Sequence, residues 1–223
     1  MKFFEIKDDD KYTLLWWAEG MGFEKIPLCP KYPEEHMTGG KRIGKLKLKI
    51  KGKRIGDFIW TWYSECLITD RVAAIFNENN VTGYELWPVE IINKELSYKV
   101  WELRTLGWAG MAPKESGIKL DLEASCEYCG HKHYTSMKEP KNLIELNHWD
   151  GNDIFMVWPL PAFKFVSQKV IDIIKKENLT GVKIIPVENL PLDRYDSGFS
   201  PSRLSYHMPD ERARLLGEPL GIY

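Results

Sequence analysis

Residues 60–90 read WTWYSECLITDRVAAIFNENNVTGYELWPVE, and residues 158–188 repeat the pattern as WPLPAFKFVSQKVIDIIKKENLTGVKIIPVE. A shift of 98 residues aligns the two stretches with nine identities over 31 positions, where composition alone would give about two. Both stretches carry Thr-Gly and, five residues later, Pro-Val-Glu. We interpret the match as an internal duplication, with copies at about residues 56–91 and 154–190.

Each copy has the pattern of a strand, a helix and a second strand. Apolar runs at 66–68 and 163–166 predict strands, and Thr69 and Ser167 follow them as N-caps of a helix. Asparagines and the glycine of Thr-Gly then predict a turn into another strand. Each unit is therefore expected to be βαβ, or βα followed by an edge strand. The helical positions that share one apolar face are Val72, Ile75 and Phe76, and Val170, Ile173 and Ile174.

Two segments outside the repeat complete the expected fold. Residues 45–51, KLKLKIK, alternate and predict a strand with one buried face and one lysine face. Residues 96–104 predict another strand, which Gly107–Gly110 breaks. The fold class is α/β (α+β), with additional antiparallel strands beside the duplicated unit. Residues 1–223 are expected to form a single domain, with 191–223 as a C-terminal tail docked on it and a short helix at 210–216.

Composition narrows the class of protein. The chain has 223 residues, 43% of them hydrophobic, which is enough for one sizeable core. The net charge of −1 gives no overall attraction to nucleic acid or to an anionic membrane. The sequence has no signal peptide and no apolar run of membrane-spanning length, so we expect a cytoplasmic protein.

Cys126-Glu127-Tyr128-Cys129-Gly130 has the spacing of half a zinc site, because two thiolates two residues apart can bind one tetrahedral ion. Further ligands are needed, and the candidates are His131, His133, Cys29 and His36. A structural zinc ion and a metal-free remnant of a zinc knuckle both stay open. The absence of an HExxH motif argues against catalytic zinc.

Several stretches resemble the double-CxxCG motif family, a paralogous family of myxobacterial type. The resemblance covers about residues 53–190. The second CxxCG motif is complete, whereas the first is represented only by Cys29. The matching stretches are GDFIWTW (56–62), TGYELWPVE (82–90), ELRTLGWAGMAPKESGIKL (102–120), SCEYCG (125–130), WDGNDIFMVWPLP (149–161) and TGVKIIPVE (180–188).

Some members of that family are similar to immunity proteins that neutralise bacterial toxins. The resemblance therefore implies a non-enzymatic binding protein whose partner is a cognate toxin. Aromatic and arginine side chains are the expected anchors of such an interface, and a cleft between the two copies is one place where they can gather. The candidate partner-binding residues are Trp60, Trp62, Trp108, Trp158, Arg194 and Tyr195.

Two other functions stay open. An enzyme, or a protein that binds a small ligand, would use a tryptophan-lined cleft with His148, Asp150, Asp153 and Arg104 nearby. No nucleophile elbow or glycine-rich phosphate loop supports catalysis, so no catalytic residue is assigned. A zinc-stapled nucleic-acid-binding module would use the lysines of 45–51, but no aromatic residue interleaves with them in sequence.

Overall fold

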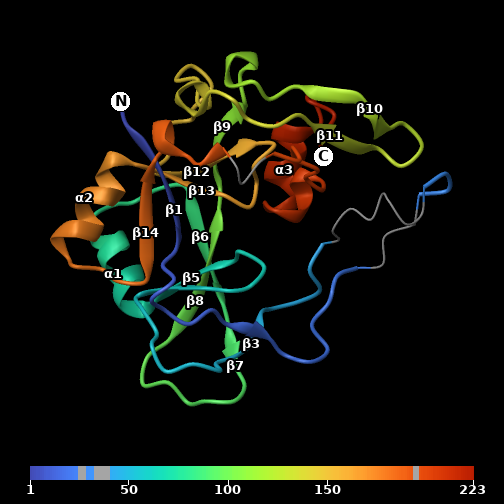
Figure 1. Cartoon of the computed structure of the whole chain (residues 1–223). Helices are drawn as coiled ribbons and strands as arrows, with labels where there is room; N and C mark the ends of the chain where they lie inside the picture. Colours follow the sequence, from blue (N-terminus) through green and yellow to red (C-terminus); the bar gives the residue numbers. More distant parts are fainter. Residues whose placement is uncertain (25–28, 33–40, 193–195) are drawn as a thin grey trace.

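The two copies of the repeat fold alike (Figure 1). The computed structural model describes residues 1–24, 29–32, 41–192 and 196–223. Each predicted strand–helix–strand unit is confirmed, with one further strand in front of it. The elements of the first copy are β4 (Phe58–Trp60), β5 (Cys66–Thr69), α1 (Asp70–Glu78) and β6 (Tyr84–Pro88), and those of the second are β12 (Ile154–Trp158), β13 (Lys164–Ser167), α2 (Gln168–Lys176) and β14 (Val182–Pro186).

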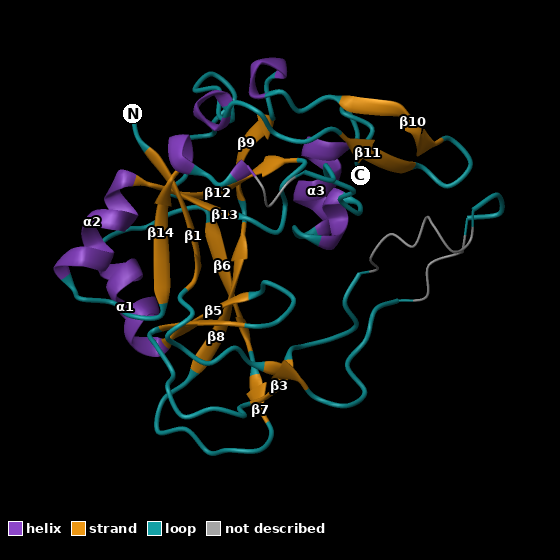
Figure 2. Ribbon diagram, viewed as in Figure 1, coloured by secondary structure: helices purple, strands orange, loops and turns teal. Residues whose placement is uncertain are grey.

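Both helices begin directly after the expected hydroxyl residue, but only the first hydroxyl caps its helix. Thr69 Oγ1 accepts from the backbone N–H of Val72 at 3.5 Å. The hydroxyl of Ser167 instead donates to Asp153 Oδ1 at 2.8 Å. The predicted apolar faces are buried in one core cluster, and the helices lie at the left of the view in Figure 2. Helix formation here rests on burial of that face more than on capping.

The two strands that flank each helix are not neighbours in the sheet. In the order β4-β5-β8-β6, strand β8 (Val100–Thr105) pairs antiparallel with both β5 and β6. In the order β14-β1-β13-β12-β9, strand β1 (Phe3–Asp8) pairs antiparallel with both β13 and β14. Each copy is thus a split βαβ unit, and β6 and β14 are edge strands, as the second of the two expected arrangements requires.

The pairing registers show that the first strands of the copies align differently from the rest. Residue 58 pairs with Ile68 and residue 154 pairs with Val166. Between these first strands the shift is therefore 96 residues, rather than the 98 that aligns the helices. Trp60 consequently occupies the position of Met156, and its sequence match with Trp158 is not a match in space. Strand β12 has five residues and β4 has three, while the connection that follows each strand has the same length, so the longer strand absorbs the difference.

Each copy is tied to the other through the same contact. Asp57 Oδ2 accepts from the backbone N–H of Thr180 at 2.9 Å and from its hydroxyl at 2.8 Å. Asp153 Oδ2 accepts from the N–H and hydroxyl of Thr82 at 3.1 and 3.3 Å. We call these the aspartate–threonine clasps. Each threonine precedes the glycine of Thr-Gly, so the most conspicuous identity of the repeat lies where the two copies meet.

Three short strands and a hairpin lie outside the two larger sheets. The lysine-rich stretch behaves as predicted, because Leu46, Leu48 and Ile50 are buried while Lys47 is exposed. Its strand pairs on both sides in the lower part of Figure 1, and the hairpin projects at the upper right. These elements are β2 (Trp16–Trp17), β3 (Lys47–Lys49) and β7 (Glu90–Ile91), and the hairpin strands β10 (Leu120–Cys126) and β11 (His131–Tyr134).

Strand β8 ends at Thr105, before the glycines, as predicted, but Gly107–Gly110 themselves lie in a strand. Residues Gly107–Met111 form strand β9, which pairs in parallel with β12. A side chain at Gly107 would overlap the backbone carbonyl oxygen of Ile154, so glycine permits close packing of the two strands instead of ending one. The strand expected over 96–104 is found as β8, four residues later at its start.

The C-terminal segment packs into the core beside β12. Helix α3 (Asp210–Gly217) forms where it was predicted. Leu204, Met208 and Ile222 are buried in the same cluster as Trp158, whereas Leu215 is 72% exposed. The chain has the expected α+β fold in one domain. None of the described helices has the length and apolar content that crossing a membrane would require.

Candidate metal centre

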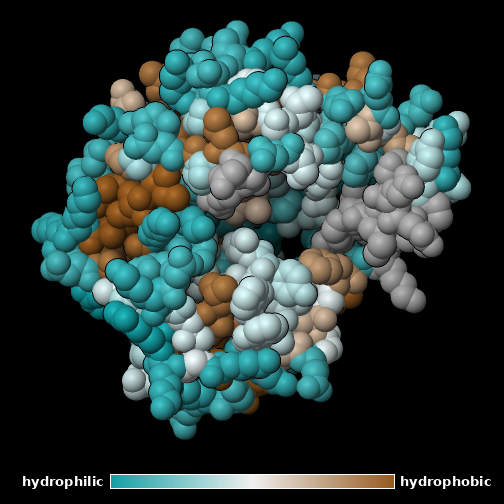
Figure 3. All heavy atoms as spheres, viewed as in Figure 1, coloured by the Kyte–Doolittle hydropathy of each residue, from teal (hydrophilic) through white to brown (hydrophobic). Residues whose placement is uncertain are grey.

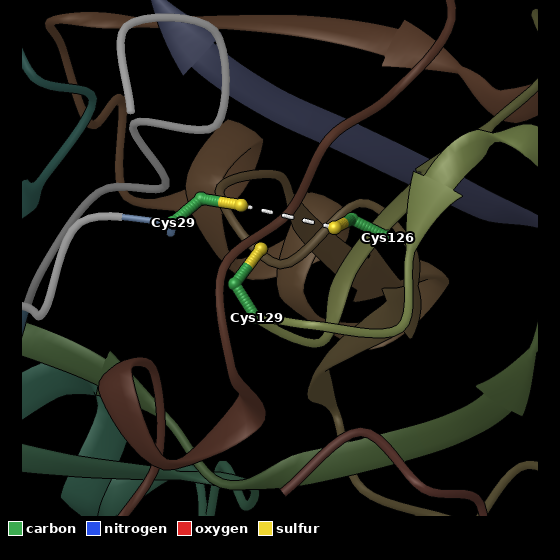
Figure 4. Close-up of side chains that lie close together, drawn as sticks. All are labelled: Cys29, Cys126 and Cys129. Atoms are coloured by element: carbon green, nitrogen blue, oxygen red, sulfur yellow. Dashed lines mark hydrogen bonds between the residues drawn. The ribbon is translucent and has the colours of Figure 1, made fainter. Parts of the chain in front are cut away.

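Three cysteine thiols converge from two distant parts of the chain (Figure 4). Cys126 ends β10 and Cys129 lies in the turn between β10 and β11, and Cys29 comes from a segment 97 residues before Cys126. The sulfur atoms of Cys29 and Cys126 are 3.8 Å apart, and all three sulfur atoms lie within 4.8 Å of one another. Thiolates bound to one tetrahedral zinc ion, with Zn–S bonds of about 2.3 Å, lie about 3.8 Å apart. The cluster therefore fits a metal ion such as zinc.

The hairpin turn presents its two cysteines to the same point. Gly130 adopts a left-handed conformation, with φ of 72°, and its N–H donates to the carbonyl of Cys126 at 2.9 Å. The turn therefore folds back at the position where glycine costs least. Cys126 is the last residue of β10 and pairs with His131 of β11, so the strand pairing fixes the position of Cys126. Cys126 is buried and Cys129 is partly exposed.

The electrostatic surroundings favour the thiolate at Cys29. Burial alone would raise the pKa of this thiol, but the backbone N–H groups of Tyr32 and Lys31 outweigh it and hold the pKa below its usual value. The N–H of Tyr32 donates to the sulfur at 3.3 Å. At Cys129 burial dominates and raises the thiol pKa. A bound cation would offset that cost, because it stabilises the deprotonated ligand.

Two of the histidines proposed as ligands, His131 and His133, lie outside the cluster. Among the residues that the structure describes, the ligand group consists of the three cysteines, without His131 or His133. The ring of His133 faces Ser200, with Nδ1 and the hydroxyl oxygen 2.8 Å apart. His36 falls outside the described residues. Among the described residues, Cys29 is thus the distant ligand candidate that lies beside Cys126 and Cys129.

Most of the candidate partner-binding tryptophans are core residues. Trp60 is 5% exposed and donates to the carbonyl of Gly181, and Trp158 is 1% exposed and donates to the hydroxyl of Tyr134. The two belong to different core clusters, and Trp108 is also buried. Trp62 is 57% exposed. Arg194 and Tyr195 lie outside the described residues.

The polar residues of the enzyme hypothesis do not form one site. Asp153 belongs to a clasp and pairs with Lys169 at 2.9 Å. Asp150 pairs with Arg212 at 2.7 Å and accepts from the N–H of Trp108. His148 faces Glu145, and Arg104 lies over the ring of Trp87. Asp150 thus stabilises a turn, as its Asp-Gly context suggests, by accepting from the N–H of Asn152, whereas Asp153 joins the two copies.

A cavity of about 580 Å³ lies elsewhere in the molecule, and no sequence pattern predicts it. Its lining comes from many separate parts of the chain, including residues 41–45, the loop before β5, strand β8 and the segment before α3. Because the charged residues of the lining are scattered singly along the chain, they form no motif that would indicate a site. No protein-family model and no curated protein matches the chain.

Proposed function

We propose that this chain is a non-enzymatic binding protein that recognises another protein through an exposed aromatic surface. Trp16, Phe23, Trp62 and Tyr63 are 40, 43, 57 and 59% exposed, and we call them the aromatic patch. The rings touch: those of Trp16 and Trp62 have centroids 5.0 Å apart, and those of Phe23 and Tyr63 6.3 Å. Adjoining exposed aromatic groups mark interaction sites, and Trp and Tyr are the commonest anchors of protein interfaces.

The charge beside the patch favours an acidic partner. Strand pairing sets Trp16 opposite Lys49, and the ammonium group of Lys51 lies 4.2 Å from the centre of the Trp16 ring. The lysine face of residues 45–51 therefore borders the aromatic patch, although the two are separate in sequence. An interface with an apolar centre and a cationic rim suits a partner with a complementary acidic surface.

A structural zinc ion is part of this proposal. Cys29, Cys126 and Cys129 would hold it, and the ion would supply a cross-link rather than chemistry. The ion would thereby fasten the hairpin to the segment that carries Cys29. Glu24, which lines the cavity described above, lies five residues before Cys29. This role agrees with the knuckle spacing and with a ligand set made of thiolates.

The resemblance to the double-CxxCG motif family suggests which partner this is. We propose a cytoplasmic immunity protein whose partner is a cognate bacterial toxin. The aromatic patch and its lysine rim support a role in protein binding, because a toxin inhibitor needs a complementary surface and no chemistry of its own.

The test begins with the tagged full-length chain as bait in its own organism. A stoichiometric partner is then expressed alone and together with the chain, and growth is measured. We expect the partner to be toxic alone and harmless when co-expressed. The variants Trp16→Ala and Trp62→Ala should lose protection, whereas Leu215→Ala, a matched change at another exposed apolar residue, should keep it. A partner that is not toxic, or protection that survives both tryptophan changes, would refute the proposal.

Single-stranded nucleic acid is a second candidate partner. The observation that favours it is the contact of Trp16 with Lys51, since aromatic rings beside lysines bind such strands by stacking and charge. Binding of an oligonucleotide would weaken steeply as salt rises. An affinity that is absent or insensitive to salt would eliminate this candidate.

A further inference from the structure

The cavity of about 580 Å³ has the size of a small-molecule site. In Figure 3 the surface is hollowed near the centre of the view. One wall carries five ionisable side chains, which we call the inner wall. They are Arg42, Glu65, Glu102, Arg104 and Lys164.

Within the inner wall, one arginine neutralises both carboxylates. Arg42 donates through two nitrogens to the two oxygens of Glu102, at 2.9 and 2.5 Å. The same guanidinium lies 3.7 Å from Glu65. A fork-like arginine–carboxylate contact of this kind is strong and fixed in geometry. Glu102 and Glu65 are therefore already engaged.

Two cations of the inner wall are left without an ion pair among the described residues. Within the part of the chain that the structure describes, Lys164 Nζ donates to the carbonyl oxygen of Ala162, at 3.4 Å. The guanidinium of Arg104 lies 4.3 Å from the centre of the Trp87 ring. Burial lowers the pKa of each of these cations, which indicates that both are partly removed from water. A partly desolvated cation gains most from an anionic partner.

The positive charges of Lys164 and Arg104 also act on a histidine of the cavity lining. His207 lines the cavity, and burial together with the charges of Lys164 and Arg104 lowers its pKa to about 3. The imidazole is therefore neutral at physiological pH. It contacts Ser202, with Nε2 and the hydroxyl oxygen 3.2 Å apart, and does not add to the cationic charge. Glu24, Lys41 and Lys45 complete the charged lining and leave it positive.

We propose that the cavity binds a small aromatic carboxylate, with its charge on Lys164 and Arg104. The inner wall has three cationic and two anionic groups, so a single negative charge balances it. Phe23, Tyr63 and Trp87 also line the cavity and offer faces against which a flat ring can pack. This site goes beyond the proposed function, and its two polar contacts, Lys164 and Arg104, lie outside the aromatic patch.

The direct test is calorimetric titration of the full chain with indole-3-carboxylate. The uncharged indole-3-carboxamide and the doubly charged phenyl phosphate serve as matched probes. We expect saturable binding of the carboxylate and weaker binding of both other probes. No saturable binding of the carboxylate, equal binding of the carboxamide, or tighter binding of phenyl phosphate would overturn the assignment.

Variants then locate the site. Lys164→Met and Arg104→Gln should each weaken carboxylate binding by about tenfold or more, as expected for loss of a charge-assisted hydrogen bond. Lys176→Met, at a lysine on the surface of α2, should leave it unchanged. Unchanged affinity in both Lys164→Met and Arg104→Gln would overturn the assignment. If either variant folds poorly, the comparison of the carboxylate with the carboxamide on the unaltered protein still tests it.

Discussion

The four cysteines have two different environments. Cys29, Cys126 and Cys129 face one another, whereas Cys66 lies on buried strand β5 and burial raises its pKa to about 12. A thiol with that pKa stays protonated and is a poor metal ligand and nucleophile. The difference gives a matched control, because one cysteine can be altered without touching the proposed metal centre.

Replacing one cysteine by serine should therefore change the zinc content at some positions and not at others. Cys126→Ser and Cys129→Ser are expected to reduce bound zinc from one equivalent per chain to a small fraction. Their Tm should fall by about 5–10 °C, since metal binding contributes to folding free energy. Cys66→Ser should also lower the Tm, but zinc content should stay at one equivalent. Metal analysis by mass spectrometry, combined with thermal unfolding, measures both quantities.

Full zinc content in Cys129→Ser, or zinc below stoichiometry in the unaltered protein, would contradict the proposed metal centre. Treatment with a chelator provides a further comparison. It should lower the Tm of the unaltered protein and leave that of Cys129→Ser unchanged.

At the scale of single elements, short-range pattern was enough for the helices. In α1 and α2 the apolar spacing and the hydroxyl residue before each helix are local signals, so both helices could be predicted. Strand β1 could not, because its neighbours β13 and β14 lie at the other end of the sequence and only their pairing makes it a central strand. For β9 a local rule misled, since Gly107 permits close strand packing.

The candidate site divides in the same way. Cys126 and Cys129 are found by spacing, because a ligand pair two residues apart is a local feature. Cys29 was one of several distant candidates, and only the fold selects it. No sequence pattern indicates the proposed carboxylate site, because Arg42, Lys164 and His207 are far apart in the chain and meet only after the sheets have formed.

The clasp at Asp57 gives a prediction about how the two copies hold together. Burial by itself raises the pKa of this carboxyl, but hydrogen bonds from Thr180 and the charge of Arg71 outweigh it, so the folded pKa is depressed. Its stabilisation is therefore complete above the unfolded pKa of about 3.9 and is lost as pH falls through the lower folded value. Asp57→Asn should cost about 1–2 kcal/mol at pH 7 and progressively less below pH 4.

Urea unfolding of Asp57→Asn at several pH values measures this effect. Asp172→Asn is the matched control, because Asp172 is an exposed residue of α2 that bonds to Gln168 on the same helix. It should change stability by less than about 0.5 kcal/mol. A cost at Asp57 that is the same at pH 3 and pH 7 would show that its charge is not what holds the clasp.

For the whole molecule, His207 predicts how stability depends on pH. Its folded pKa of about 3 lies below the usual 6.5, because burial and the charges of Lys164 and Arg104 disfavour the imidazolium. The unfolded chain thus takes up a proton between these values and the folded chain does not. The contribution is complete above about pH 6.5 and declines as pH falls toward 3. The free energy of unfolding should therefore drop over this range.

Comparison with His207→Gln isolates this contribution from those of the carboxylates. Between pH 7 and pH 4 the free energy of unfolding should decrease less in the variant than in the unaltered protein. His148→Gln, at an exposed histidine, should follow the unaltered protein. Equal slopes for His207→Gln and the unaltered protein would contradict the burial of a neutral imidazole.

Strand β1 lies between two other strands of its sheet, and both of these strands are synthesised much later than β1. Strand β1 ends at Asp8, but its first partner, β13, begins at Lys164. At translation rates of about 5–20 residues per second, this interval is on the order of 10–30 s. The sheet formed by β4, β5, β8 and β6 is complete by Thr105 and can assemble on the ribosome, while Phe3, Phe4 and Ile6 still await their partners. The nascent chain must keep these apolar side chains from aggregating for that time, so β1 is the segment on which a ribosome-associated chaperone would act.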